Sequence, residues 1–259
     1  MPSARSLTIR GINGILRYAG VRIVALRPGG ETPGLPDIEP WVSRIISEVR
    51  PFTVTSDERL SALCHATRYV AKNRIPGDIV ECGVWRGGSM MAAAMTLAAE
   101  RDESRTLYLF DTFEGMSEPG PFDRTTISGE TALSIKEKVR ETGEGWGYAP
   151  LDEVRDNLRK TGYREDRMSF IKGKVENTIP SKAPDNIALL RLDTDWYEST
   201  RHELIHLYPR LSTGGILIID DYGHWEGARK AVDEYIKEKQ LKLLLQRIDY
   251  TGRLAIKVQ

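Results

Sequence analysis

The chain has 259 residues, of which 40% are hydrophobic and 29% charged, and its 37 basic and 37 acidic side chains give a formal net charge of zero. This length suits one large α/β domain, and the balanced charge argues against a protein that binds nucleic acid through a broad basic face. The longest apolar stretch, residues 90–99, is about half a membrane span, and Cys64 and Cys82 lack metal-type spacing, so we expect no membrane contact and a reducing, cytoplasmic location.

Residues 1–40 are predicted to form an N-terminal arm and a linker, ahead of one main domain over residues 41–259. Arginines recur in an apolar background before the first acidic residue, Glu31: Arg5, Arg10, Arg17, Arg22 and Arg27. One interpretation is a cationic arm that contacts anionic lipid or a partner subunit, which would allow a homodimer. The other is a helix packed on the domain with solvated arginines. Residues 27–40 are rich in Pro and Gly, which is typical of a linker.

The main domain opens with a predicted helix over residues 55–77, which begins with a Ser-x-x-Arg capping pattern and stops at a Pro-Gly pair. Three segments follow: DIVECGV (78–84), GSMMAAAMTLAAE (88–100) and TLYLFD (106–111). Their patterns predict a strand, a helix and a second strand. This order is the signature of a parallel βαβ unit.

The remaining elements continue the alternation after a glycine-rich, charged stretch at residues 115–150, which we interpret as a lid over the substrate. Helices are predicted at residues 151–163, 199–215 (with a Gly-Gly stop) and 227–239, and strands at residues 168–175, 188–195 and 216–222. Residues 241–249 and 253–259 resemble a closing hairpin around Tyr250-Thr251-Gly252. The pattern predicts an α/β fold: one Rossmann-like, doubly wound, mostly parallel sheet with a C-terminal antiparallel hairpin.

A glycine-rich loop, ECGVWRGGS, follows the first strand, where such a sheet binds its cofactor. Gly83, Gly87 and Gly88 allow a sharp turn and a close approach of backbone to ligand. Their spacing is not that of a dinucleotide loop, and the carboxylate of Glu81 would repel phosphate but accept hydrogen bonds from an amino group. Asp111 ends the second strand, where an acid suits the hydroxyls of a ribose. Together these residues indicate S-adenosylmethionine.

Two later strands end in paired acids: LLRLDTD with Asp193 and Asp195, and ILIIDD with Asp220 and Asp221. The carboxyl ends of parallel strands meet at one edge of the sheet, so these four carboxylates should converge near the cofactor. Unpaired, they would repel one another, and a hard divalent cation removes that penalty. Helix N-caps are the alternative, but a cap explains one Asp at each junction and not two.

Two residues are candidates for the general base that takes a proton from an acceptor hydroxyl. Asp195 returns to the same side of the strand as Asp193 if the strand extends that far. His224, three positions after Asp221, is the second candidate. Aromatic side chains nearby could form a wall for a sugar or ring substrate, although core packing is their usual role: Trp196, Tyr222 and Trp225.

The combination of motifs resembles the macrocin O-methyltransferase (TylF-like) family, which uses S-adenosylmethionine and Mg²⁺ to methylate hydroxyls on antibiotic sugars and includes a phenol-methylating aminocoumarin relative. The resemblance covers most of residues 77–235. It is carried by PGDIVECGVWRGGS, LFDTFEGM, LDEVRDNLRKTGY, ALLRLDTDWYEST and LYPRLSTGGILIIDDYGHWEGARKAVDEY. Residues 1–50 and the stretch after Phe122 match no pattern of the family, so the acceptor is the least defined element.

The resemblance implies a class I methyltransferase fold and a role for each matched residue. Glu81, Gly83 and Ser89 would line the cofactor, and Asp111 would hold its ribose. Val175 or Glu176, within residues 173–176, would lie beside the adenine, and Arg86 would neutralise the cofactor carboxylate. The Mg²⁺ ligands would be Asp193, Asp220 and Asp221, with Asp195 as the base.

The function that we expect is therefore Mg²⁺-assisted transfer of a methyl group from S-adenosylmethionine to a hydroxyl of a sugar or glycosylated natural product. A catechol or phenol O-methyltransferase of secondary metabolism is the alternative in the same class. A metal-dependent phosphoesterase would have to tolerate Glu81 beside its phosphate loop. A non-catalytic binding protein should have lost a metal position, and none is lost here.

Overall fold

The computed structural model describes residues 37–141 and 145–258. The predicted arm therefore lies almost wholly outside the described residues. From Glu39 onward the chain forms one compact unit. Within the part that is described, no helix combines the length and the apolar character that crossing a bilayer requires.

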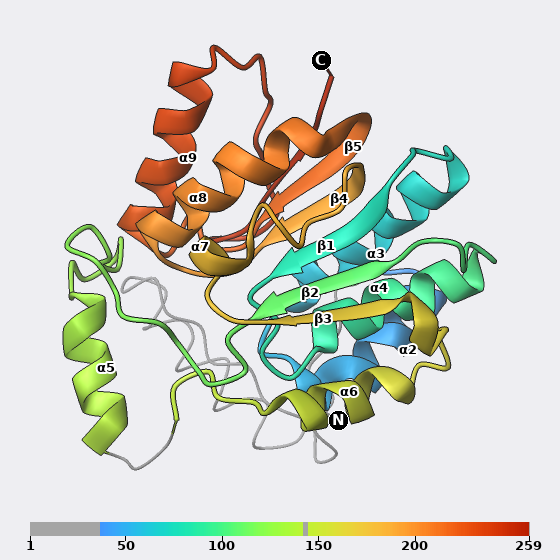
Figure 1. The fold of residues 1–259 in the computed structure, drawn as a ribbon, viewed down its shortest axis with the longest axis horizontal. Coiled ribbons are helices and arrows are strands. Elements are labelled where there is room, and N and C mark those ends of the chain that lie inside the picture. Colours follow the sequence, from blue (N-terminus) through green and yellow to red (C-terminus); the bar gives the residue numbers. More distant parts are fainter. Residues whose placement is uncertain (1–36, 142–144, 259) are drawn as a thin grey trace, which may run out of the picture. The chain divides into compact units, whose positions relative to one another are not determined.

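A seven-stranded sheet runs through this unit in the order β3-β2-β1-β4-β5-β7-β6 (Figure 1). The first five strands in that order are parallel, and β7 and β6 pair antiparallel at one edge. The prediction of a doubly wound, mostly parallel sheet is confirmed. The strands span β1 Asp78–Cys82, β2 Leu107–Asp111, β3 Met168–Lys172, β4 Ile187–Leu192, β5 Leu211–Ile219, β6 Gln246–Arg247 and β7 Arg253–Ile256.

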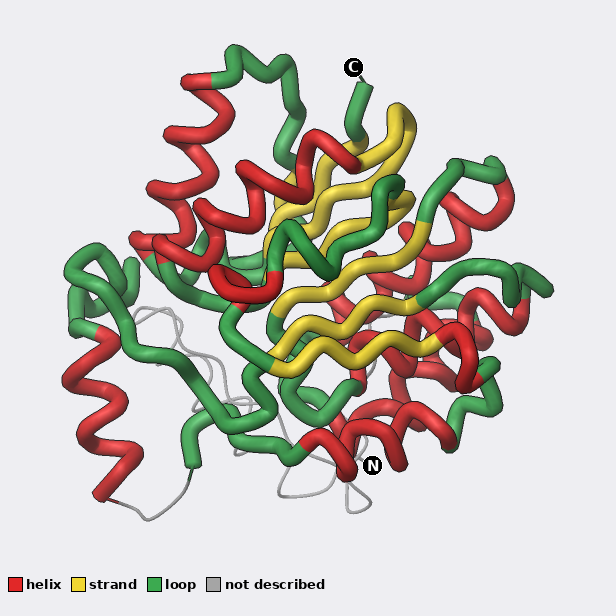
Figure 2. The backbone as a smooth tube through the Cα atoms, viewed as in Figure 1, coloured by secondary structure: helices red, strands yellow, loops and turns green. Residues whose placement is uncertain are grey.

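Helices cover both faces of the sheet (Figures 1 and 2). One face carries α2 (Pro40–Val49), α3 (Asp57–Lys72), α4 (Gly88–Ala99) and α6 (Leu151–Arg159), and the other carries α7 (Val175–Thr178), α8 (Tyr197–Leu207) and α9 (Glu226–Glu238). Helix α5 (Ala132–Glu141) stands apart from both layers. Short 3₁₀ turns complete the set: η2 Arg50–Phe52, η3 Glu165–Arg167 and η4 Tyr208–Arg210.

The helices on the first face follow from local sequence. Ser56 caps α3, its Oγ accepting a hydrogen bond from the backbone N–H of Arg59 at 3.2 Å, as the Ser-x-x-Arg pattern predicts. Leu60, Leu63 and Val70 of α3 face the core. Helix α4 is apolar on nearly all sides because it is enclosed by α2, α3, α6 and the sheet.

The predicted Gly-Gly helix stop is wrong, because Gly214 and Gly215 lie inside β5. Helix α8 ends at Leu207, and β5 begins at Leu211. In the pairing with β4, Ile187 faces Leu211 while Leu189 faces Ile216, so β5 carries extra residues between these two pairs. Gly214 has φ 80° and donates to the carbonyl oxygen of Lys257 at 2.6 Å. A glycine is needed because the bulged chain passes through a left-handed conformation.

The predicted closing hairpin is present but shorter than expected. Of residues 241–249, only Gln246–Arg247 forms a strand against β7, and residues 241–245 belong to no strand of the described structure. Leu241, Leu243 and Leu245 pack partly against the core, whereas Leu244 points outward. The alternation that suggested a strand therefore reflects one-sided burial of an extended segment.

Candidate active site

A cavity of about 770 Å³ opens at the carboxyl ends of the parallel strands, a volume that suits a small-molecule ligand. Most residues predicted for the site line it: Gly83, Ser89, Asp111, Val175, Glu176, Asp193, Asp195, Asp220, Asp221 and His224. The fold brings these side chains together from the ends of β1, β2, β3, β4 and β5. Residues 115–117 and 145–148 also line the cavity, so both described ends of the predicted lid reach the site.

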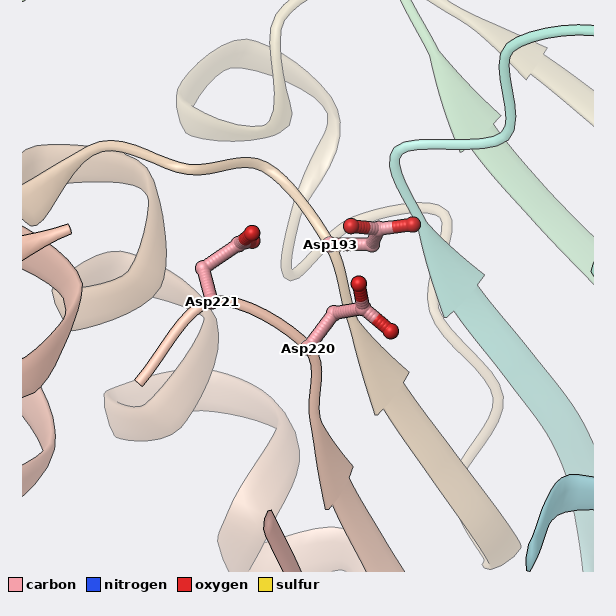
Figure 3. A group of neighbouring side chains, drawn as sticks. All are labelled: Asp193, Asp220 and Asp221. Carbon is pink, nitrogen blue, oxygen red and sulfur yellow. The ribbon is translucent and has the colours of Figure 1, made fainter. Parts of the chain in front are cut away.

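Asp193, Asp220 and Asp221 converge where β4 and β5 end (Figure 3). Each offers a carboxylate oxygen that lies within 4.8 Å of an oxygen of the other two. Burial raises the pKa of Asp221 well above its usual range, and the neighbouring carboxylates of Asp195 and Asp193 add to this effect. The three side chains therefore form a cluster of carboxylates whose ionised state a bound cation would stabilise.

Among the described residues, two arginines contact this group, and the sequence reasoning missed both. Arg191, within β4, donates to Asp193 Oδ2 at 2.6 Å and to Asp220 Oδ1 at 2.5 Å. Arg59, on α3, pairs with Asp220 Oδ2 and with Asp249 at 3.0 Å. A signal for Arg191 was available, because a charged residue in the apolar run IALLRL must find a partner when its strand is buried. The sequence gives no comparable signal for Arg59.

The charges at this edge of the sheet do not balance. Six carboxylates of the described residues (Glu81, Asp193, Asp195, Asp220, Asp221 and Asp249) surround the two guanidinium groups, which leaves four negative charges if all groups are ionised. A divalent cation would reduce this excess. Asp193, Asp220 and Asp221 offer the carboxylate oxygens that hard divalent cations such as Mg²⁺ take as ligands.

Asp195 lies beside the three carboxylates with its backbone in a left-handed conformation, φ 66°. Its N–H donates to Asp221 Oδ2 at 3.1 Å, and its Oδ1 accepts from Trp225 Nε1 at 2.6 Å. Burial raises the pKa of Asp195 to about 6. A carboxylate held in this way, in the cavity and close to neutral pKa, can accept a proton from a bound hydroxyl.

His224 lines the same cavity. Its Nδ1 lies 3.3 Å from the hydroxyl of Tyr250, and burial together with the charge of Arg59 lowers its pKa. The imidazole is therefore neutral near pH 7 and has the protonation state that a base requires. Both predicted base candidates are present at the site, and Asp195 is the more firmly oriented of the two.

Gly83 sets the position of the glycine loop. Its φ is 83°, and a Cβ atom there would collide with the carbonyl oxygen of Asp193 at the end of β4. The loop thus packs directly against the carboxylate group. Asp111 holds it there, because its Oδ2 accepts from the N–H groups of Val84 at 2.6 Å and Trp85 at 3.0 Å.

Four residues predicted for the cofactor are not among those that line the cavity. Glu81 is buried and pairs with Arg191 at 2.5 Å. Arg86 pairs with Glu153 at 2.6 Å and donates to the carbonyl oxygen of Pro51. Gly87 and Gly88 lie close to the side chain of Leu158 and to Phe52–Thr53. These residues build the surroundings of the loop, and the structure gives Arg86 a partner other than a ligand carboxylate.

The predicted aromatic wall is arranged differently from expectation. Trp196 and Trp225 are buried, with ring centroids 5.0 Å apart, and both contact Trp146, which lines the cavity. Trp146 therefore presents an aromatic surface that the other two support. Tyr222 does not line the cavity, and its hydroxyl donates to Asp233 on α9.

The family model of macrocin O-methyltransferase (TylF) matches residues 48–255. The chain belongs to the macrocin O-methyltransferase family. The resemblance found in the sequence is thereby confirmed, and so is its implication that the chain is an S-adenosylmethionine-dependent O-methyltransferase.

Curated relatives of this macrocin O-methyltransferase family member come from Streptomyces and Micromonospora species. One is the 8-demethyl-8-(2,3-dimethoxy-alpha-L-rhamnosyl)-tetracenomycin-C 4'-O-methyltransferase of Streptomyces olivaceus. It is 36% identical over 85% of this chain and 80% of its own length. Demethyldecarbamoylnovobiocin O-methyltransferase of Streptomyces niveus is 34% identical, over 77% of this chain and 73% of its own. Mycinamicin III 3''-O-methyltransferase of Micromonospora griseorubida is 32% identical, over 77% and 76%.

Solved structures support the same assignment. The O-methyltransferase NovP superposes with a TM-score of 0.71 at 28% identity, covering 98% of this chain and 99% of NovP. The calicheamicin methyltransferase CalS11 gives a TM-score of 0.62 at 19% identity, covering 90% of this chain and 99% of CalS11. The second likeness concerns the fold alone.

Proposed function

We propose that this enzyme methylates a hydroxyl on the sugar of a glycosylated natural product. S-adenosylmethionine would be the methyl donor, and Mg²⁺ would bind to the carboxylates of Asp193, Asp220 and Asp221. The observation that carries the proposal is the convergence of Asp193, Asp220 and Asp221 in the wall of the cavity that the glycine loop also lines. Methyl donor, cation and acceptor would then share one enclosed space.

The cavity fits S-adenosylmethionine in size and in the chemistry of its walls. Gly83 and Ser89 would lie along the methionine part, Asp111 near the ribose, and Val175 with Glu176 beside the adenine. When bound, this cofactor supplies an electrophilic methyl group. Oδ2 of Asp111 already accepts hydrogen bonds from the glycine loop. A ribose hydroxyl would therefore contact Oδ1, which also accepts from the N–H of Phe113 at 2.7 Å.

Asp193, Asp220 and Asp221 would hold Mg²⁺. The ion would supply positive charge that lowers the pKa of an acceptor hydroxyl. An alkyl hydroxyl of a sugar needs this help more than a phenol, because its unperturbed pKa is far higher. The metal would therefore contribute more to catalysis with a sugar acceptor than with the catechol or phenol alternative.

The chain's own residues handle the proton. Asp195 would accept it at its carboxylate, which the indole Nε1–H of Trp225 holds in place, while the backbone N–H of Asp195 donates to Asp221. Trp146 packs against the buried rings of Trp196 and Trp225. It would cover the acceptor sugar and exclude water from the site. His224 is the base if Asp195 is not.

The acceptor class is inferred from the relatives and from the rim of the cavity. The names of two relatives specify positions typical of sugar rings, 4' and 3''. At the rim, Val54, Tyr148 and Tyr250 line the cavity and are largely exposed. These side chains suit the apolar body of a glycosylated natural product. A cytoplasmic location and a homodimer stay predictions.

The test uses purified protein, labelled S-adenosylmethionine and a panel of glycosylated polyketides and aminocoumarins. We expect labelled product that requires Mg²⁺ and disappears with excess chelator, while calorimetry shows that S-adenosylmethionine still binds. Unchanged turnover in chelator would remove Mg²⁺ from the mechanism. Folded protein that does not bind S-adenosylmethionine would contradict the whole proposal.

A further inference from the structure

Arg191 is a buried charge at the centre of the sheet, with 3% of its surface exposed. It lies on β4 between β1 and β5, and its guanidinium reaches the ends of all three strands. Nη1 donates to Glu81 Oε1 at 2.5 Å and to Asp193 Oδ2 at 2.6 Å, and Nη2 donates to Asp220 Oδ1 at 2.5 Å. Burying a guanidinium is costly unless charged partners surround it, and here three carboxylates accept its hydrogen bonds.

Glu81 is one of the three carboxylates that compensate this charge. It faces Arg191 directly in the register of β1 and β4 and is 2% exposed. Its Oε2 is buried and has no hydrogen-bond partner among the described residues, and Glu81 is not among the residues that line the cavity. Its carboxylate is thus directed at Arg191 and not at ligand space.

When Glu81 is ionised, the Glu81–Arg191 pair carries no net charge, so it can orient the neighbouring acids without cancelling their attraction for a cation. The rigid fork of Arg191 contacts one oxygen of Asp193 and one of Asp220. It therefore fixes the separation of two carboxylates that come from different strands. A flexible or single-nitrogen donor could not hold both.

We infer that Arg191 is a positioning residue for the divalent-cation site, and that Glu81 anchors Arg191 instead of binding the cofactor. This inference rests on the proposed function, because it needs a cation at Asp193, Asp220 and Asp221. It changes the role that the sequence suggested for Glu81. It also adds to the site a residue that touches neither cofactor nor acceptor.

The experiment measures cation affinity directly, without cofactor or acceptor. Full-length wild type, Arg191→Lys and Glu81→Gln are titrated with Mn²⁺, with free Mn²⁺ followed by electron paramagnetic resonance. S-adenosylhomocysteine affinity is measured separately by calorimetry. Loss of a group that orients metal ligands typically weakens metal binding about 10–100-fold. We expect Arg191→Lys to weaken Mn²⁺ binding by about tenfold or more, and Glu81→Gln to weaken it by a smaller factor, with S-adenosylhomocysteine affinity unchanged in both.

Arg105 offers a matched control. It is also a buried arginine, but it donates to the carbonyl oxygens of Ile75 at 2.7 Å and Gly77 at 2.5 Å, before β1 begins. Arg105→Lys should reduce thermal stability and leave Mn²⁺ affinity at the wild-type value. The comparison distinguishes a general loss of stability, which altering any buried arginine can cause, from a loss of Mn²⁺ affinity that is specific to the cation site.

The possible outcomes distinguish a failure of the proposed metal site from a failure of the positioning role of Arg191. Wild-type protein that binds no Mn²⁺ would overturn the metal part of the proposed function, and the inference with it. If wild type binds Mn²⁺ and Arg191→Lys binds it equally well, the inference alone is wrong. A Glu81→Gln variant that loses S-adenosylhomocysteine but keeps Mn²⁺ would return Glu81 to the cofactor site. If Arg191→Lys does not fold, Glu81→Gln carries the test.

Discussion

Trp225 donates a hydrogen bond from its indole Nε1 to Oδ1 of Asp195 at 2.6 Å. The indole cannot turn away, because it packs edge-on against Trp196 and lies 6.3 Å from Trp146 between ring centroids. Its backbone is also fixed, since Trp225 forms a β-bridge with Thr125 just before α9 begins. A buried aromatic residue thus sets the direction of the carboxylate that we propose as base.

Trp225→Phe removes this donor and keeps an aromatic ring. We expect kcat to fall about tenfold with little change in S-adenosylmethionine affinity, because a base that loses its orientation forfeits part of its 10²–10⁴-fold contribution. Steady-state kinetics with calorimetry checks this. Trp196→Phe is the matched control, since its Nε1 donates to the carbonyl oxygen of Ser117 and not to Asp195. Equal losses of kcat in the two variants would contradict a specific role for Trp225.

Asp221→Ala should abolish methyl transfer and leave S-adenosylmethionine binding largely intact. The reason is that Asp221 is a proposed cation ligand, whereas the cofactor is proposed to bind along Gly83, Ser89 and Asp111. The variant should also be as stable as wild type or more stable, because it removes a buried carboxylate that Asp195 and Asp193 repel. Calorimetry, a methyl-transfer assay and thermal unfolding test the three parts. Asp233→Asn, on α9 outside the cavity, serves as a control that should remain active.

Gly83→Ala should unfold or strongly destabilise the enzyme. The new methyl group would meet the backbone of Asp193, which cannot move without disturbing β4, and the residue would also keep φ 83°. We expect a loss of about 3–5 kcal/mol in the free energy of unfolding, measured by urea denaturation. Gly129→Ala isolates the conformational part, because Gly129 has φ 69° but no atom within 4 Å of an added Cβ. That control should lose about 1–2 kcal/mol, and similar losses in both would contradict the steric argument.

The two cysteines should not react with a thiol reagent such as Ellman's at pH 8 until the protein unfolds. Burial raises the pKa of Cys64 to about 11, and it raises the pKa of Cys82 well above the usual range. Below about pH 9 the thiol of Cys64 is protonated in both states. From about pH 9 to 11 the unfolded state loses its proton first, so stability falls by roughly 2–3 kcal/mol.

Urea midpoints of wild type and Cys64→Ala at pH 8 and pH 10 test this dependence on pH. The substitution should make the alkaline loss of stability smaller, because the thiol that ionises on unfolding is gone. A variant that loses as much stability as wild type between the two pH values would show that Cys64 is not the source. Rapid reaction of either thiol in the folded protein would contradict the burial of both.

The sequence was sufficient for the alternation of strands and helices along the chain and for the place where the acids meet. Both follow from patterns that act locally, namely apolar runs that end in acids and the parallel βαβ rule that puts those ends at one edge. Glu81 shows the limit of this reasoning. Its position before the glycine loop is compatible with a cofactor contact, but its partner Arg191 lies 110 positions away, and only the register of β1 against β4 brings them together.

Arg59 and the Gly214–Gly215 pair show two further limits. Arg59 reaches Asp220 across 161 positions, through the packing of α3 on the sheet, and nothing in the sequence around Arg59 indicates this contact. Glycines after a helical pattern most often end the helix, which is why the sequence predicts a helix stop at this pair. In the structure they belong to a strand whose bulge is fixed by its neighbours, which a local pattern does not reveal.

The packing of Trp146, Trp196 and Trp225 gives this enzyme a built-in optical probe. Three of its five tryptophans lie with ring centroids 5.0–6.3 Å apart and at steep interplanar angles, a geometry in which indole transitions couple. Only Trp146 of the three faces the cavity. Occupancy of the cavity will therefore alter one member of a coupled set, so near-ultraviolet circular dichroism and intrinsic fluorescence can follow filling of the site without any added label.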